Sequence, residues 1–211
     1  MVEQIILLVP AILIALTFHE YAHGYVAYRL GDPTAKMAGR LTFNPIPHLD
    51  PIGTLMLFLV HFGWAKPVPV DPRYFKDPKR DMLLVAAAGP VMNMILAFIS
   101  GVLISLIAGG GMVKSPMMTI LTQILFYSLM INLALAVFNM LPIPPLDGSK
   151  VLRGLLPYRY EHFALELERI GPMVLIGLIL FGIVTGKSIL WAFIGPFVDF
   201  FIKLFTFGSF S

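Results

Sequence analysis

Apolar segments of about 20 residues constrain this chain more than any other feature of its sequence. A helix needs about 20 apolar residues to cross a hydrocarbon core about 30 Å thick. Four segments meet or nearly meet that length, at residues 5–28, 82–108, 117–141 and 190–207. A fifth, residues 170–185, is shorter but can span with little tilt. We therefore expect an all-α polytopic membrane protein with about five transmembrane helices.

Composition supports a membrane protein and excludes several classes of function. Of 211 residues, 58% are hydrophobic and only 13% are charged, against about a quarter in soluble domains. The net charge of +3 is too small to indicate nucleic-acid binding. No cysteine is present, which excludes disulfides, cysteine zinc sites and thiol nucleophiles. Without repeats or a low-complexity linker, the chain is predicted to be one membrane-embedded domain over residues 1–211.

A sixth apolar run, residues 51–64, is bounded by proline and glycine and is too short to cross comfortably. We expect a re-entrant or interfacial hairpin at about residues 51–70, since non-helical backbone at membrane depth must be packed in protein or line a cavity. With five spans and this hairpin, twelve lysines and arginines fall on one side and two on the other. Such a bias indicates an N-terminus outside the cell and two basic cytoplasmic segments.

One polar motif interrupts the first apolar segment: His19-Glu20-Tyr21-Ala22-His23. Residues four apart lie on one face of a helix, so His19 and His23 can both offer a nitrogen to one Zn²⁺. Glu20 lies one step round the helix, where it can act on water rather than ligate the metal. His19 is 14 residues after Ile5, roughly 21 Å along a helix axis. The pair is therefore predicted within the membrane, nearer its cytoplasmic side.

A catalytic zinc site needs a third protein ligand, and Asp147 is the candidate. It follows Pro142, Pro144 and Pro145, which forbid a regular helix and predict that the third span breaks at its cytoplasmic end. The five-span topology places this break on the same side of the membrane as the histidines. The alternative for Asp147 is a turn-forming Asp-Gly, because Gly148 follows it.

Several segments together resemble the site-2 protease family of intramembrane zinc metalloproteases. They are Phe18-His19-Glu20-Tyr21-Ala22-His23, Gly89-Pro90-Val91-Met92-Asn93, and Leu146-Asp147-Gly148 behind the lead-in Asn139 to Pro142. Residues 48–53 and 63–70 are similar to segments of the compact bacterial members. Larger members carry a PDZ-type or a nucleotide-sensing domain, for which we expect no room here.

The resemblance covers about residues 5–155, which we expect to be the catalytic core. The two apolar segments after residue 170 are expected to form a C-terminal helical hairpin at about 170–207. The resemblance implies one Zn²⁺ per chain held by His19, His23 and Asp147, with Glu20 as general base. It also implies hydrolysis of a peptide bond in the transmembrane helix of a substrate in the lipid bilayer. Asn93 is a candidate either for donating to the oxyanion or the substrate backbone, or for bonding a neighbouring helix.

A non-catalytic alternative is a zinc-binding transporter or a pseudoprotease that binds a partner's helix, because polar residues at membrane depth also suit a transport path. Glu20 and the lack of internal repeat symmetry favour the protease. The spans after residue 170 carry no motif and could serve packing, gating or contacts in a homo-oligomer. His48 and Asp50, flanked by prolines, are expected to fix the loop that enters the hairpin rather than to bind metal.

Overall fold

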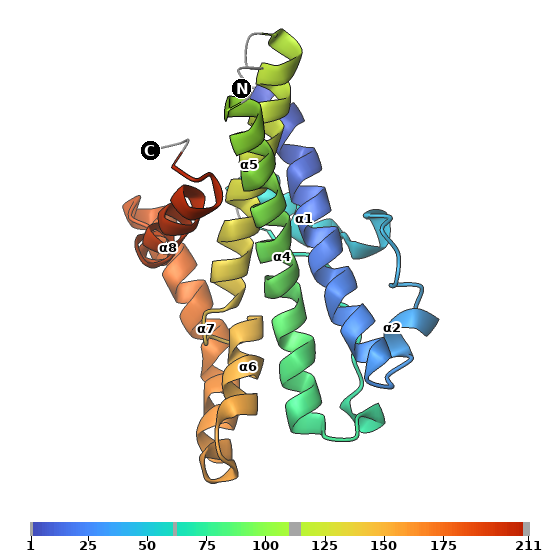
Figure 1. Ribbon diagram of the computed structural model, residues 1–211. Helices are drawn as coiled ribbons and strands as arrows, with labels where there is room; N and C mark the ends of the chain where they lie inside the picture. Colours follow the sequence, from blue (N-terminus) through green and yellow to red (C-terminus); the bar gives the residue numbers. More distant parts are fainter. Residues whose placement is uncertain (1, 61–62, 110–114, 209–211) are drawn as a thin grey trace.

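The computed structural model of the protein describes residues 2–60, 63–109 and 115–208 (Figure 1). In this part of the chain the fold is all helical, apart from a single isolated bridge between Leu49 and Ala65. The α-helices are α1 (Val2–Arg29), α2 (Thr34–Met37), α3 (Pro51–Val60), α4 (Pro78–Gly109), α5 (Pro116–Asn139), α6 (Asp147–Leu155), α7 (Glu161–Thr185) and α8 (Ile189–Phe205). Three short 3-10 turns, η1 (Ile46–His48), η2 (Pro72–Tyr74) and η4 (Tyr158–Tyr160), lie in the connections.

Four helical segments are long and apolar enough to cross a membrane: Leu7–Arg29, Pro78–Gly109, Pro116–Asn139 and Tyr158–Thr185. They correspond to four of the predicted spans, which confirms the all-α polytopic architecture. The fourth segment begins well before residue 170, because the charged residues that follow Tyr160 form the first turns of α7. The charged residues before the predicted span at 170–185 are therefore part of the same continuous helix.

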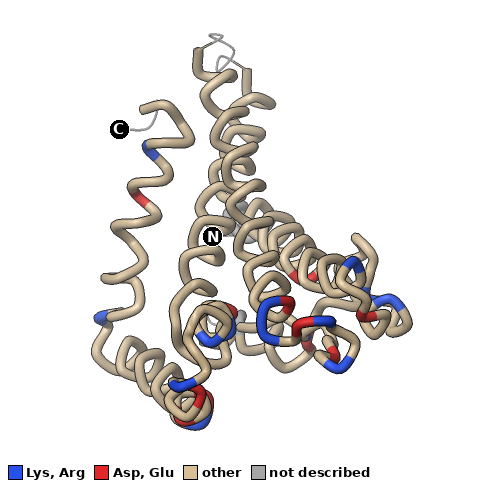
Figure 2. Tube along the Cα trace, turned by 60° about the horizontal axis from the view of Figure 1, so that its bottom comes forward, with Lys and Arg blue, Asp and Glu red and all other residues tan. Residues whose placement is uncertain are grey.

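The last predicted span differs from the others. Helix α8 has 17 residues, about 26 Å of helix, and lies at a steep angle to α4 and α5, as Figures 1 and 2 show together. Its C-terminal end is held against α4, where a Cβ on Gly101 would lie 2.7 Å from Phe205 Cβ and Ser105 Oγ donates to Thr206 O at 2.7 Å. The exact number of spans after α5 therefore depends on α8.

Polar residues and prolines mark where several helices begin. Pro116 and Pro78 are the first residues of α5 and α4, a position where the missing N–H of proline has no helical partner to lose. Ser115 accepts a hydrogen bond from Met118 N, and Ser188 caps α8 in the same way. Gly186, with φ of 69°, ends α7 in the left-handed conformation that glycine adopts without steric cost.

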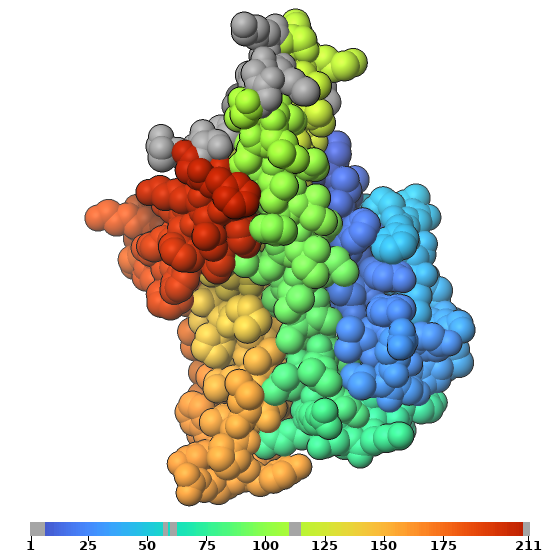
Figure 3. Space-filling view, viewed as in Figure 1, coloured from blue at the N-terminus to red at the C-terminus, as the bar shows by residue number. Residues whose placement is uncertain are grey.

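Helix α4 is the centre of the bundle and packs against α1, α5, α6 and α8. In the space-filling view of Figure 3, α4 lies between the blue N-terminal segments and the orange and red C-terminal helices. The main apolar core joins α4, α5, α7 and α8 and includes Ile104, Leu129, Leu133, Leu175, Ile194 and Val198. Large exposed apolar side chains on α4, α5 and α7 face outward, as expected of helices in contact with lipid.

The predicted break after the third span is present. Helix α5 ends at Asn139, and α6 begins eight residues later at Asp147. Gly148 lies inside α6 rather than in a turn, and its role is close packing: a Cβ there would lie 2.2 Å from Met140 O. Because only glycine permits that approach, α6 starts directly against the end of α5, which fixes the position of Asp147.

The chain segments immediately before and after the apolar run at residues 51–64 lie side by side. Helix α3 has only 10 residues, too few to span. Leu49 before it and Ala65 after it pair in an antiparallel bridge, and Lys66 N donates to His48 O at 2.9 Å. The chain then continues in extended form to Asp71; we call residues 63–71 the strap. These contacts agree with the expected re-entrant or interfacial hairpin.

Charged residues gather at one end of the bundle. Figure 2 shows most lysines, arginines, aspartates and glutamates at the end where α1 and α6 finish and α4 and α7 begin. Among the described residues outside that end, charged side chains are sparse (Lys187, Asp199 and Lys203 are examples). The geometry agrees with two basic segments on one side of a membrane, and the cytoplasmic location of that side stays a prediction from the positive-inside rule.

Candidate metal centre

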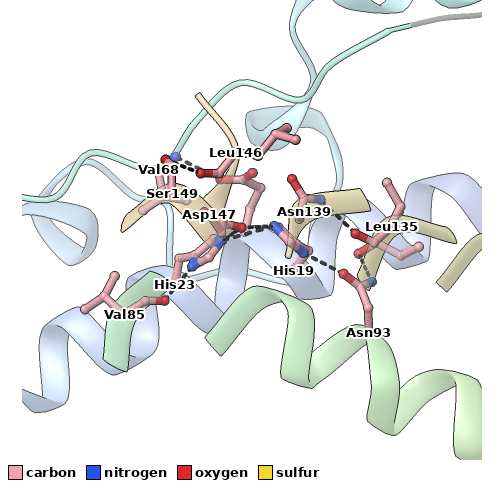
Figure 4. Close-up of polar contacts among 12 residues, drawn as sticks. His19, His23, Val68, Val85, Asn93, Leu135, Asn139, Leu146, Asp147 and Ser149 are labelled. Atoms are coloured by element: carbon pink, nitrogen blue, oxygen red, sulfur yellow. Dashed lines mark hydrogen bonds and ion pairs between the residues drawn. The ribbon is translucent and has the colours of Figure 1, made fainter. Parts of the chain in front are cut away.

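Three side chains from two helices meet at the predicted metal site. His19 and His23 lie one turn apart on α1, and Asp147 is the first residue of α6. Figure 4 shows the three side chains pointing toward one another. Asp147 Oδ2 lies 3.1 Å from Nε2 of each histidine, and the two Nε2 atoms are 3.0 Å apart. Their exposed fractions are only 5%, 9% and 8%.

This donor set fits zinc. Zinc binds imidazole nitrogen and carboxylate oxygen at about 2.0–2.2 Å in a tetrahedral arrangement, which places ligand atoms roughly 3.3 Å apart. The observed separations of 3.0 and 3.1 Å are close to that spacing. Two neutral nitrogens, one carboxylate and an open fourth position are a typical catalytic zinc set. Among the described residues this is the group of three His, Asp or Glu side chains whose ligand atoms converge within 4.8 Å.

A glycine on α4 makes room for both histidines. A Cβ built on Gly89 would lie 2.4 Å from His23 Nε2 and 2.6 Å from His19 Nε2. Both distances are far below normal contact, so any side chain at this position would displace the two rings. The Gly89-Pro90 pair that carries part of the family resemblance therefore has a direct steric role at the site.

Outer hydrogen bonds orient both imidazoles. His23 Nδ1 lies 2.7 Å from the backbone carbonyl of Val85, and His19 Nδ1 lies 2.5 Å from Asn93 Oδ1. Both partners are oxygen acceptors, so each Nδ1 donates a proton, which leaves Nε2 as the ring nitrogen available to a metal. Protonation at Nδ1 leaves both rings ready to ligate a metal through Nε2.

Asn93 lies on the opposite side of His19 from Asp147 (Figure 4). Its Oδ1 accepts from His19, and its Nδ2 donates to Ala15 O at 3.2 Å and to Asn132 Oδ1 at 2.8 Å. Both hydrogens of the amide are thus engaged within the protein. Of the two roles expected for Asn93, this geometry favours positioning and helix contact over donation to an oxyanion.

The side chain of Glu20 is hydrogen-bonded to the strap. Glu20 Oε2 accepts a hydrogen bond from Val68 N at 2.9 Å. Val68 lies between Pro67 and Pro69, which have no N–H, so its amide is the one donor of this tripeptide. The strap is in turn fixed at its end, where Asp71 N donates to Asp32 Oδ2 at 2.8 Å.

Arg40 holds the same segment from the other side. Its guanidinium donates to Pro67 O at 3.0 Å and to Lys66 O at 2.6 Å, and the residue is only 6% exposed. Burial lowers the pKa of Arg40, and the negative charge of Glu20 opposes that shift. Arginine remains protonated in proteins, so Arg40 places a buried positive charge near Glu20.

His48 and Asp50 stay outside the metal cluster. His48 is buried with Nε2 2.9 Å from Thr42 O, and Asp50 Oδ1 accepts from Gly53 N at 2.7 Å at the start of α3. Both contacts agree with the expected role of fixing the loop that enters the hairpin. His61, another histidine of that segment, lies outside the described residues.

Three contributors to the site are not evident from the motifs: Arg40, Asn132 and the carbonyl of Val85. Asn132 had a signal in the sequence, because a polar amide within an apolar span is costly unless it is paired. Val85 contributes its backbone carbonyl, and the guanidinium of Arg40 binds backbone carbonyls of the strap; backbone partners leave no trace in residue identity.

A mainly apolar cavity of about 540 Å³ lies beside the site. It is bounded by the part of α1 that precedes His19, by α5, by the hairpin and by α8. Its lining includes Leu13, Leu16, Trp64, Leu135, Phe138 and Trp191. The three donor residues do not line this cavity, but Leu16, which lies one turn before His19 on α1, does. A space of this kind can accept apolar side chains.

Comparison with known proteins gives a consistent result. Residues 7–182 match the family described as Peptidase family M50. The chain is 43% identical over 200 residues to "Putative zinc metalloprotease YwhC" of Bacillus subtilis, covering 94% of this chain and 90% of the relative. It is 30% identical over 153 residues to "Putative zinc metalloprotease Rip2" of Mycobacterium tuberculosis, covering 70% of this chain and 56% of the relative.

A more distant relative is "Zinc metalloprotease MJ0392" of Methanocaldococcus jannaschii, 26% identical over 180 residues, with 84% of this chain and 43% of the relative covered. No solved structure matches significantly. The relatives' names specify zinc, in agreement with the cofactor predicted from the sequence. The match over most of its length shows that the chain belongs to peptidase family M50, the site-2 protease family.

Proposed function

We propose that this protein is an intramembrane zinc metalloprotease that cleaves membrane-tethered substrates within or near their transmembrane segments. The observation that carries the proposal is the convergence of His19, His23 and Asp147 beside Glu20. The two histidines and Glu20 lie in the C-terminal half of a helix long enough to span a membrane. In this proposal the three converging side chains hold one Zn²⁺ and Glu20 is the general base.

In the proposed reaction the metal ligands, Glu20 and the outer hydrogen-bond partners have separate roles. Zinc bound by the three side chains would supply Lewis acidity that lowers the pKa of water to about 7 and polarises a peptide carbonyl. Glu20 accepts a proton from the water that attacks the carbonyl carbon, and it returns that proton to the amine nitrogen as the C–N bond breaks. The hydrogen bonds from Val85 O and Asn93 hold both imidazoles in orientation throughout.

The apolar cavity and the strap support a route for the substrate. A transmembrane helix hides its carbonyls in its own hydrogen bonds, so the scissile segment must be extended to reach the site. The cavity between α1, α5 and α8 suits apolar side chains, and extended backbone at the strap suits capture by strand addition. A Cβ on Gly53 would lie 2.2 Å from Trp64 O, so Gly53→Ala should displace the strap and reduce cleavage while zinc content is unchanged. Unreduced cleavage would argue against capture by the strap.

We further propose that the protein is a multi-pass protein of the cell membrane with its N-terminus outside and its active site toward the cytoplasm. The charged end of the bundle in Figure 2 supports this orientation. Lipid and the helix of a membrane-protein substrate would then be its partners.

The central test compares wild type with Glu20→Gln, both purified in detergent. Zinc content and cleavage of a membrane-tethered substrate are measured side by side. We expect about one zinc per chain in both proteins and cleavage by wild type alone, because glutamine cannot accept the proton. Zinc in both proteins with cleavage by neither would favour the non-catalytic alternative, a transporter or a pseudoprotease. Equal cleavage by both would exclude Glu20 as the base.

A further inference from the structure

A chain of buried polar side chains runs from the metal site into the interface of α4 and α5. It begins at His19, passes through Asn93 on α4, and reaches Asn132 on α5. Asn132 Nδ2 then donates to Ser128 O, one turn earlier on α5, at 2.8 Å. Asn93 and Asn132 are both 0% exposed. Uncharged amides buried in a span need a reason, since each polar group left unpaired there costs several kcal/mol.

The two histidines differ in how firmly their hydrogen-bond partners keep a proton on Nδ1. The partner of His23 Nδ1 is a backbone carbonyl, which can only accept a hydrogen bond. The partner of His19 Nδ1 is an amide side chain, which can present either its oxygen or its NH₂ group. If Asn93 presented its NH₂ group, His19 Nδ1 would accept and Nε2 would carry the proton. Nε2 would then have no lone pair for a metal.

The hydrogen bond to Asn132 fixes which end of the Asn93 amide faces His19. Its Oδ1 accepts from Asn93 Nδ2 at 2.8 Å, which turns Asn93 Oδ1 toward His19. The orientation of Asn132 is in turn set by Ser128 O, a backbone group that can only accept. Ala15 O is a second acceptor for Asn93 Nδ2, but at the longer distance of 3.2 Å. The sequence of donors and acceptors is thus fixed from Ser128 O to His19 Nδ1.

We propose that Asn132 is a positioning residue that acts through Asn93 to keep the proton of His19 on Nδ1 and so keeps Nε2 free to ligate zinc. This inference rests on the proposed function, because it takes His19 as a metal ligand. The competing explanation is that Asn132 only holds α4 and α5 together by interhelical hydrogen bonding.

The same helix pair offers a matched control. Ser100 Oγ on α4 donates to Ser128 Oγ on α5 at 3.0 Å. Ser100→Ala removes this α4–α5 hydrogen bond but leaves the contact between Asn93 and Asn132 in place. Asn132→Leu removes the acceptor for Asn93 with little change in volume. Asn132→Asp is the conservative variant, because a neutral carboxyl group can still accept from Asn93 and donate to Ser128 O.

The test measures zinc affinity of the full-length, metal-free protein in detergent by competition with a chromophoric chelator. Loss of an outer partner of a metal-binding histidine costs about 10–100-fold in affinity. We expect Asn132→Leu to bind Zn²⁺ about tenfold more weakly, at the lower end because Ala15 O remains. Asn132→Asp and Ser100→Ala should stay within about threefold of wild type on the same scale.

A second readout does not depend on metal. Nitrogen-15 NMR of histidine-labelled apoprotein reports which ring nitrogen of His19 carries the proton. We expect His19 Nδ1 to carry a proton in wild type and in Ser100→Ala, and a fraction of the molecules to lack that proton in Asn132→Leu. If the leucine variant does not fold, Asn132→Ala takes its place with the same expectation.

The outcomes separate the inference from the proposed function. Unchanged affinity and tautomer in folded Asn132→Leu would overturn the positioning role while the zinc site stands. Equal losses in Asn132→Leu and Ser100→Ala would show that only helix packing matters, which also overturns it. Absence of zinc binding by wild type itself would instead reject the proposed metal site.

Discussion

Gly89→Ala is the sharpest single test of how the site is built. The added methyl group would lie 2.4 Å from His23 Nε2 and 2.6 Å from His19 Nε2. Non-bonded atoms of this size prefer about 3.5 Å, so the overlaps are roughly 0.9 to 1.1 Å. Gly89 is buried in α4, the helix that contacts α1, α5, α6 and α8. The histidine rings should therefore move rather than the backbone of α4.

The expected effect on metal binding is larger than the effect on stability. Zinc sites tolerate ligand shifts of about 0.2 Å, and a ring displacement near 1 Å exceeds that several times. We expect zinc affinity to fall by at least ~100-fold, beyond the loss typical of an outer partner. Overpacking costs about 1–3 kcal/mol, and alanine gains about 1 kcal/mol over glycine within a helix. The net change in the free energy of unfolding should thus stay within about 2 kcal/mol.

The assay combines zinc content after reloading, thermal unfolding in detergent, and cleavage of a membrane-tethered substrate. Gly177→Ala is the matched control, since a Cβ at Gly177 on α7 meets no atom within 4 Å. The control should retain both zinc and cleavage. A folded Gly89→Ala protein that binds one zinc per chain and cleaves as wild type does would refute the steric argument.

Three further predictions concern the strap, the metal and pH. Arg40→Met removes two charge-assisted hydrogen bonds to the strap, each worth about 1.5–3 kcal/mol. Limited proteolysis should therefore cut residues 63–71 faster than in wild type. An unchanged cutting rate would show that other contacts hold the strap. Treatment with a zinc chelator should abolish cleavage, and added Zn²⁺ should restore it, whereas activity that persists after chelation would exclude a metal mechanism. Hydrogen bonds from Arg73 lower the pKa of Asp71 below its usual 3.8, so any stability from this pair is complete above pH 3.8 and is lost as pH falls through the lower folded value. NMR titration of Arg73→Ala should show the Asp71 pKa rising toward 3.8, and no rise would contradict this assignment.

Local spacing and chain topology were enough to place the centre of the candidate site. The four-residue spacing of His19 and His23 puts both on one face of α1. The prolines before Asp147 predict a helix break, and charge bias predicts which side of the membrane it faces. The structure brings these three residues together as expected. The roles of these residues as zinc ligands remain proposals for the experiments above.

What the sequence could not predict depends on packing between distant segments. The contacts of Arg40 are with backbone carbonyls 26 and 27 residues away, and any residue type presents a carbonyl. Asn93 contacts His19, which is 74 residues away in the sequence. Whether the side chain of Asn93 faces solvent, substrate or His19 depends on how α4 is rotated against α1. The inclination of α8 likewise follows from close packing at Gly101, which an apolar pattern does not encode. The charged residues at the start of α7 are not part of an apolar run, so the apolar pattern predicted a span of residues 170–185 only, whereas the helix begins at Glu161.

The distance along the chain between the donors has a consequence for biogenesis. Asp147 is 128 residues after His19 and 124 after His23. During synthesis, α1 enters the membrane with both imidazoles while the carboxylate that completes the cluster has not yet been translated. The cluster can close only after α4 and α5 are inserted and α6 has packed against the end of α5 at Gly148. A growing chain that has not yet reached Asp147 therefore cannot assemble the three-donor centre, and the order of translation itself delays its completion until α1, α4 and α5 have been made.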